Sequence, residues 1–200
     1  MQSTFFKSEV KLLLTRLASV KIGDNSVEFF QNELGKAQEL SADVRTNPDI
    51  QESHRERIEA APKIPLTDAN SQMLKHDLRP SPSGLELSYY RELANQDPAL
   101  ALTGLRIELE IIGQNLAKGF NIEVPKNASV ARVFHALANG YAITNKQYNL
   151  VQSITRLANS AVHGAPISRD DANAVIDTAD VLRDSYLSWL SWGFNENEPL

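Results

Sequence analysis

Two rows of residues at helical spacing run through NKQYNLVQSITRLANSAVHG, residues 145–164. The first row is apolar and consists of Leu150, Ile154, Leu157 and Ala161. The second row is polar and consists of Gln152, Arg156, Asn159 and His163. At about 100° per residue, the polar row lies roughly 200° around a helix from the apolar row. We therefore predict an amphipathic helix that buries one row in a core and turns the other away from it.

Capping signals on both sides of this stretch mark further helices. Asp97 followed by Pro98 is typical of a helix start, and that helix should end at Gly119. Similar signals predict helices over 85–95, 129–139, 144–163 and 168–192. Short connections favour antiparallel neighbours. The expected fold is all-α: residues 85–192 form an antiparallel bundle of four or five helices, whose core includes Leu105, Leu109, Ile112, Leu150, Ile154, Leu157, Val175 and Leu182.

The part before the bundle divides into an arm and a linker. Residues 1–44 are expected to hold an amphipathic helix from Phe5 to Leu17, a small β-hairpin and a helical arm from Phe30 to Val44. The hairpin prediction rests on apolar and polar alternation in 20–22 and 27–29, around the turn-rich residues 23–26. Residues 45–84 hold five of the nine prolines and many charges, which predicts a linker with a short helix around 50–60. Residues 193–200 are expected to be a C-terminal tail.

Composition limits the possible chemistry. The chain has no cysteine, which excludes disulfides, thiolate nucleophiles and cysteine-ligated metal. The four histidines show no metal-ligand spacing, so we expect neither metal nor cofactor. The net charge of -5 predicts that any RNA contact is local. No apolar run approaches the roughly 18 residues that would span a bilayer, and no signal peptide is recognised. We expect a cytoplasmic protein.

The string RLANSAVHG, residues 156–164, resembles the signature helix of the HEPN superfamily. Its large uncharacterised bacterial branch is similar in having an asparagine four residues before a histidine, followed by glycine, as at Asn159, His163 and Gly164. The upstream run LRIELE, residues 105–110, is similar to that branch's arginine-plus-glutamate helix. The resemblance covers about half the chain. It implies a dimeric helical bundle that pairs its signature helices, and a context of bacterial or phage conflict and defence.

The resemblance also implies site residues. HEPN ribonucleases are understood as metal-independent, which makes His163 the candidate acid or base for RNA cleavage. Arg156 would stabilise the phosphorane and Asn159 would orient the imidazole or the phosphate. Arg106 and Glu110, one turn apart, could form a supporting pair. In active members an arginine commonly precedes the asparagine directly, whereas this chain has Ala158 there.

Two functions remain open after this comparison. The first is a noncatalytic interaction or RNA-associated module, in which the altered motif supports the fold or a homodimer and the N-terminal arm recruits a protein partner. The second is a metal-independent endoribonuclease that uses His163 with Arg156 and Asn159. Whether the protein is an enzyme is left undecided by the sequence.

Overall fold

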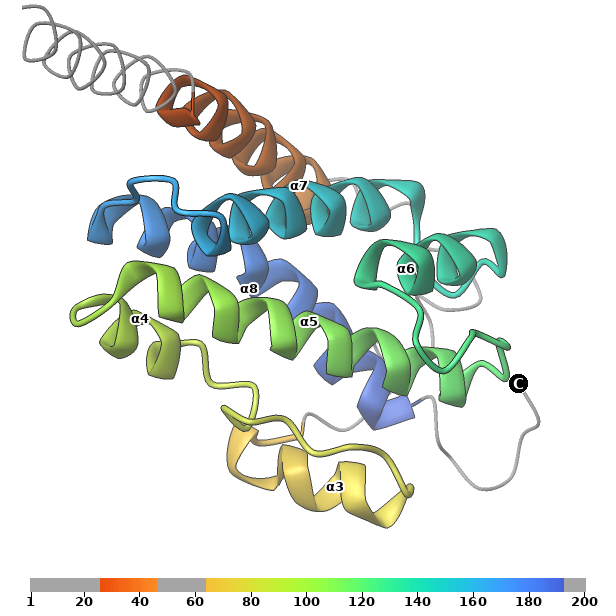
Figure 1. Ribbon diagram of the computed structural model, residues 1–200. Coiled ribbons are helices and arrows are strands. Elements are labelled where there is room, and N and C mark those ends of the chain that lie inside the picture. Colours follow the sequence, from red (N-terminus) through yellow and green to blue (C-terminus); the bar gives the residue numbers. More distant parts are fainter. Residues whose placement is uncertain (1–25, 47–63, 193–200) are drawn as a thin grey trace, which may run out of the picture.

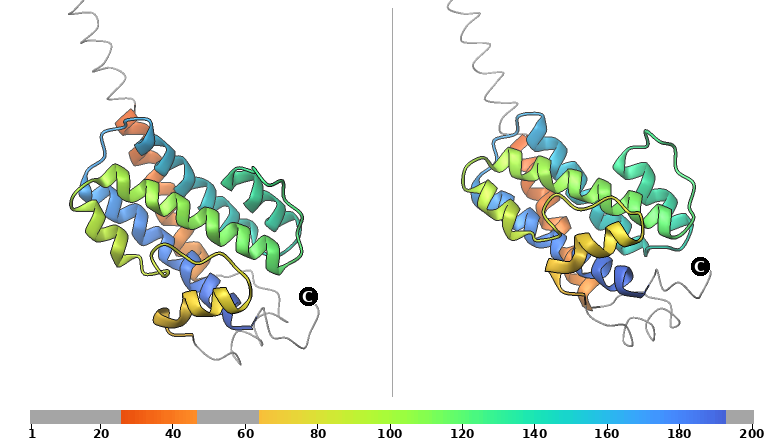
Figure 2. Two further views of the ribbon diagram at one scale, coloured as in Figure 1. Left: turned by 60° about the horizontal axis from the view of Figure 1, so that its bottom comes forward. Right: turned by 90° about the horizontal axis from the view of Figure 1, so that it is seen from below.

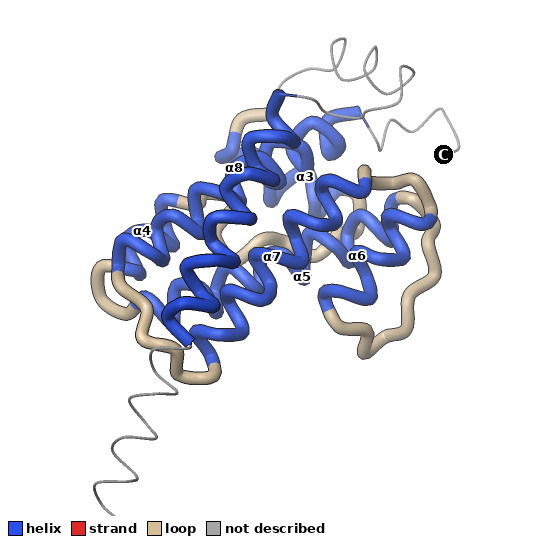
Figure 3. The backbone as a smooth tube through the Cα atoms, turned by 90° about the horizontal axis from the view of Figure 1, so that it is seen from above, coloured by secondary structure: helices blue, strands red, loops and turns tan. Residues whose placement is uncertain are grey.

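The computed structural model describes residues 26–46 and 64–192, and within these ranges every regular element is helical (Figure 3). A helix covers residues 26–46, and the further elements are η1 (Leu66–Asp68), α3 (Ala69–Lys75), α4 (Ser88–Ala94), α5 (Pro98–Gly119), α6 (Val130–Asn139), α7 (Asn145–Val162) and α8 (Arg169–Trp192). Helix α5 lies in the middle and packs against α4, α6, α7 and α8 (Figure 1). No helix in the described ranges is long and apolar enough to cross a membrane.

The predicted starts of α5 and α7 are confirmed by their capping bonds, whereas the helix predicted over 85–95 begins only at Ser88. The Asp97 carboxylate accepts a hydrogen bond from the Leu100 amide at 2.9 Å, with Pro98 at the first helical position. The side chains of Thr144 and Gln147 form a reciprocal capping box at the start of α7. These local signals therefore place the helices of the bundle along the chain.

One hydrophobic core joins the helices, and all eight predicted core residues belong to it. Leu150, Ile154 and Leu157 of α7 are each fully buried. The same core includes Phe30, Leu34, Ala37 and Val44 of the helix over 26–46. This helix, orange in Figure 2, is therefore part of the bundle's packing and is not a separate arm.

The predicted β-hairpin is wrong in its second strand. Residues 27–29 lie in the first turn of the described helix, while the first strand, 20–22, falls outside the described residues. A three-residue alternation fits a helix as well as a strand. The helical spacing of the buried side chains Phe30, Leu34 and Ala37 decides between the two, because only a helix puts all three on the core side.

The prediction of a linker is wrong for residues 64–84, while 47–63 and the predicted short helix around 50–60 are outside the described residues. Helix α3 packs on α8, and Met73 and Leu78 are buried in the common core. The segment has few large apolar side chains, so its packing depends on polar anchors that composition does not reveal.

Buried and half-buried amide and carboxylate groups provide those anchors. Asn70 exchanges two hydrogen bonds with the backbone of Ser81, at 2.8 and 3.0 Å. Asn115 of α5 does the same with the backbone of Arg79, at 2.8 and 3.0 Å. The Glu108 carboxylate accepts hydrogen bonds from the hydroxyls of Ser83 and Tyr90, at 2.9 and 2.7 Å. Residues 76–87 are thereby fixed to α3 and α5.

Candidate functional site

The helix over residues 26–46 packs beside the polar row of α7 and leaves Arg156 and His163 exposed. Arg156 contacts Glu33 and Lys146 contacts Asp43, and in both pairs the residue numbers add to 189 (33 + 156 and 43 + 146). A constant sum means that the two helices run antiparallel in one register. The row therefore faces away from the α5 core, as predicted, but a second helix lies beside it (Figure 1).

Glu33 is the centre of this contact. Its side chain accepts hydrogen bonds at one oxygen, Oε1, from Nε and Nη2 of Arg156 at 2.8 and 2.6 Å and from the Ser153 hydroxyl at 2.7 Å. Glu33 is 4% exposed, whereas the Arg156 side chain keeps 47% of its surface in water. The carboxylate thus lies buried at the helix interface with a half-exposed cation as its partner.

The ionised form of Glu33 is favoured in this position. Burial raises the pKa of Glu33, but the hydrogen bonds from Ser153 and Arg156 and the positive charges of Arg156 and Lys36 outweigh it. The pKa therefore lies below the usual value of a glutamate. At neutral pH, Arg156 faces a negative charge supplied by its own chain.

The three predicted catalytic residues line one shallow hollow of about 300 Å³ at the C-terminal end of α7. Arg156, Asn159 and His163 form one side, and Ser26 and Phe29 form the other. Phe29 is 47% exposed, so an aromatic ring stands beside the polar residues at the surface. The structure therefore brings the sequence motif together, but with Arg156 already engaged by Glu33.

His163 ends α7 and is exposed. The chain reverses behind it at Gly164, whose φ of +85° is open to glycine but costly for other residues. The Gly164 amide donates to the Ala161 carbonyl at 3.1 Å and the Ala165 amide donates to the Ser160 carbonyl at 3.0 Å, the two bonds of a Schellman motif. Among the described residues the imidazole has no hydrogen-bond partner. No side chain of residues 26–46 or 64–192 therefore orients His163 as an acid or base.

The proposed supporting pair does not form. Glu110 accepts a hydrogen bond from Gln114 at 3.3 Å, and no bond within the described ranges joins it to Arg106. The Nε atom of Arg106 is buried without a hydrogen-bond partner. The α5 glutamate held in a network is instead Glu108, two residues earlier, which the sequence did not single out.

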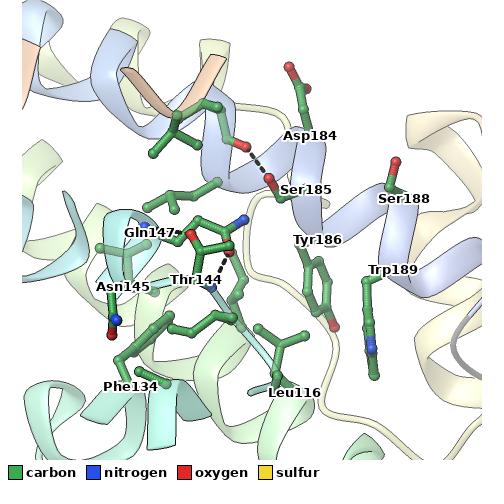
Figure 4. A pocket seen from close by; sticks show the side chains of 18 of the residues that line it. Leu116, Phe134, Thr144, Asn145, Gln147, Asp184, Ser185, Tyr186, Ser188 and Trp189 are labelled. Atoms are coloured by element: carbon green, nitrogen blue, oxygen red, sulfur yellow. Dashed lines mark hydrogen bonds between the residues drawn. The ribbon is translucent and has the colours of Figure 1, made fainter. Parts of the chain in front are cut away.

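A larger cavity lies away from this motif, between α5, α6, α7 and α8 (Figure 4). Its volume is about 510 Å³. Leu116, Phe134, Tyr186 and Trp189 supply apolar walls, with Thr144 and Gln147 at the start of α7. The end of the helix over 26–46 also contributes to the lining, through Val44 and Arg45. The sequence did not predict this cavity, because its lining comes from five helices spread along the chain.

Comparison with protein-family models, with curated proteins and with solved structures gave no match. Within the described ranges, no group of three or more His, Cys, Asp or Glu side chains is placed to hold a metal ion. The α7 surface, the hollow at its C-terminal end and the larger cavity are therefore the features that bear on function.

Proposed function

We propose that the chain is a HEPN-like interaction module, noncatalytic in itself, that belongs to a bacterial or phage defence context and associates as a homodimer. The context and the family are carried by the motif residues Asn159, His163 and Gly164. The observation that carries the noncatalytic role is the ion pair between Glu33 and Arg156, at 2.6 Å.

This ion pair counts against phosphate binding. A ribonuclease needs an available cation to stabilise the phosphorane. Here the Arg156 guanidinium is neutralised, and an RNA phosphate in the hollow would meet the negative charge of Glu33 close by. The predicted acid or base, His163, also has no hydrogen bond to an orienting side chain within the described part of the chain. Binding to a protein surface demands neither feature.

The homodimer in this proposal forms at the exposed end of the helix pair. Val27, Phe29 and Val162 are 39%, 47% and 51% exposed there. In the register of the two helices, Val27 lies opposite Val162, because their numbers also add to 189 (27 + 162). Phe29 and His163 line the same hollow, which places apolar surface beside the motif. A two-fold contact would bury these side chains against their copies.

Light scattering on the full chain at tens of micromolar tests the dimer. We expect twice the chain mass for the wild type and the mass of one chain for Phe29→Ser. Leu74→Ser is the matched control, because Leu74 is 63% exposed on α3, away from this surface, and its loss should leave the dimer intact. A wild-type chain that scatters as a monomer would contradict the dimer.

The alternative function is a metal-independent endoribonuclease, and the meeting of His163, Arg156 and Asn159 in one hollow favours it. Its test is cleavage of varied single-stranded RNAs in the presence of a chelator. We expect no cleavage by the wild type or by Glu33→Gln, in which Arg156 is released from its charged partner.

Cleavage that leaves 2′,3′-cyclic ends would contradict the noncatalytic role and support the endoribonuclease. In that case His163→Ala should lower the rate about a hundredfold to ten-thousandfold. His135→Ala, which removes an exposed histidine on α6, is the control and should cleave like the wild type.

A further inference from the structure

The cavity between α5, α6, α7 and α8 has the size and lining of a small-molecule site. Its volume of about 510 Å³ falls within the range of about 300 to 1,000 Å³ that is usual for ligand pockets. Leu109, Ile112 and Leu116 of α5 lie on one side, and Leu182 and Tyr186 of α8 on another. The walls belong to the common core, so they are held in place by packing.

One wall of the cavity is a stack of aromatic rings. Trp189 lies between Phe120 and Tyr186, with ring centroids 5.3 and 5.8 Å away and interplanar angles of 29° and 25°. Tyr186 and Trp189 stand side by side in Figure 4. Rings fixed in this way form a rigid apolar wall, and no side chain has to be ordered when a ligand packs against it.

Several polar groups of the lining already have hydrogen-bond partners within the protein. The side chains of Thr144 and Gln147 are used in the capping box of α7. The Tyr186 oxygen accepts a hydrogen bond from Asn115 at 2.9 Å, and the Ser185 hydroxyl donates to the Val181 carbonyl at 2.8 Å. A polar ligand body would leave its own donors and acceptors unpaired, so this lining favours an apolar body.

The charges that line the cavity differ in their availability. Asp184 is paired with Arg183 at 2.7 Å. Arg45, in the last turn of the helix over 26–46, is exposed and has no ion-pair partner among the described residues. An anionic group would therefore find one unpaired cation at this site, whereas a cationic group would find a carboxylate that is already neutralised.

From these observations we propose that the cavity binds a small amphipathic anion, with its apolar body against the Tyr186 and Trp189 rings and its charged end at Arg45. The site is separate from the α7 surface and does not depend on the function proposed for it. The ligand class is an aromatic or aliphatic body that carries one carboxylate, sulfonate or similar group.

A pair of dyes distinguishes the two parts of this proposal. Anilinonaphthalene sulfonate has an aromatic body and one negative charge, and phenylnaphthylamine is its neutral counterpart. The protein is the full chain with Trp192→Phe, which leaves Trp189 as its one tryptophan and as the energy donor to a bound dye. We expect saturable binding of one molecule of either dye per chain, with quenching of Trp189.

Variants then locate the binding. Ser185→Phe should fill the cavity and abolish binding of both dyes. Thr103→Phe is the matched control, because Thr103 bonds its own helix as Ser185 does but lies outside the cavity, and it should bind like the parent chain. Arg45→Gln should weaken the sulfonate about two- to fivefold, as loss of an exposed ion pair does, and leave the neutral dye unchanged.

Three results would overturn the proposal. The first is no saturable binding to the parent chain, which is also expected if the chain's own residues fill the cavity. The second is binding that Ser185→Phe leaves intact, since the dye would then lie elsewhere. The third is an equal effect of Arg45→Gln on both dyes, which would show that Arg45 does not bind the negative charge of the ligand. Near-ultraviolet circular dichroism of each variant shows whether its tertiary packing is retained, since loosely packed states also bind such dyes.

Discussion

At Glu33 the two partners of one ion pair differ in burial, and this difference predicts unequal mutational effects. Removing Arg156 leaves a carboxylate that is 4% exposed without its charged partner, whereas removing Glu33 leaves a cation that still reaches water. We expect Arg156→Ala to lower the free energy of unfolding by about 1.5 to 3 kcal/mol, the usual range for hydrogen bonds to charged groups. Glu33→Ala should cost less.

Urea unfolding of both single variants and the double variant measures this difference. The coupling free energy should lie between about 0.5 and 3 kcal/mol, as for residues in direct contact. Lys36→Ala is a control at the edge of the same site, because its 3.8 Å contact with Glu33 is exposed and should contribute little. Additive effects of Glu33→Ala and Arg156→Ala would show that the two side chains do not interact in solution.

The same carboxylate should make stability depend on pH. Its pKa is lower in the folded chain than in the unfolded chain, where the pKa of a glutamate is about 4.3. The folded state then binds fewer protons, so the contribution of Glu33 is complete above the unfolded pKa and is lost as the pH falls through the folded pKa. The stability difference between wild type and Glu33→Gln should be constant near neutrality and shrink in acid. A difference that does not vary with pH would contradict the lowered pKa.

At the scale of the element, the close approach of α5 and α6 predicts that replacing Gly113 by alanine lowers stability, although alanine usually stabilises a helix. A methyl group there would lie 2.6 Å from the ring of Phe134, which is 3% exposed and cannot move aside freely. Overpacking usually costs about 1 to 3 kcal/mol, more than the roughly 1 kcal/mol that alanine gains over glycine in a helix. Gly113→Ala should therefore destabilise the fold.

Gly35 is the control for this prediction. It lies within the helix over 26–46, and a methyl group there would have no atom within 4 Å. Gly35→Ala should raise the free energy of unfolding by about 0.5 to 1 kcal/mol through helix propensity alone. Thermal and urea unfolding of both variants give the comparison, and a stabilised Gly113→Ala would show that α6 can shift to make room.

Elements could be predicted from the sequence where the deciding residues are neighbours along the chain. The capping box of Thr144 and Gln147 spans one turn, and the buried row of α7 repeats within a single helix, so both can be recognised locally. The contact of Glu33 with Arg156 joins residues 123 positions apart, which no local pattern reveals. The packing of residues 64–84 likewise depends on distant partners, such as Asn115 for the backbone of Arg79. The motif residues and a helix from Phe30 to Val44 were therefore predictable, but the packing of that helix against α7 was not.

For the whole molecule, the shared core predicts one cooperative unfolding transition. Phe30 and Val44 belong to the same buried cluster as Ile154 of α7 and Trp189 of α8, so loss of the helix over 26–46 would expose part of the core that α7 and α8 also use. A variant of the helix interface should therefore shift the whole transition. A chain of this size should lose about 2 to 4 °C in melting temperature for each kcal/mol by which its free energy of unfolding falls.

Glu33→Ala and the wild type, each with Trp192→Phe, test this cooperativity. Far-ultraviolet circular dichroism follows all helices, while the fluorescence of Trp189 reports the far end of α8, which does not include the Glu33 contact. If the helix over 26–46 is part of one folding unit, the two signals should coincide in both proteins, and both midpoints should move together in the variant. A helical signal that falls before the Trp189 signal in Glu33→Ala would show that this helix opens alone. The helix could then leave α7 while the bundle stays folded, which would release Arg156 from Glu33 and remove the Phe29 side of the hollow around Asn159 and His163.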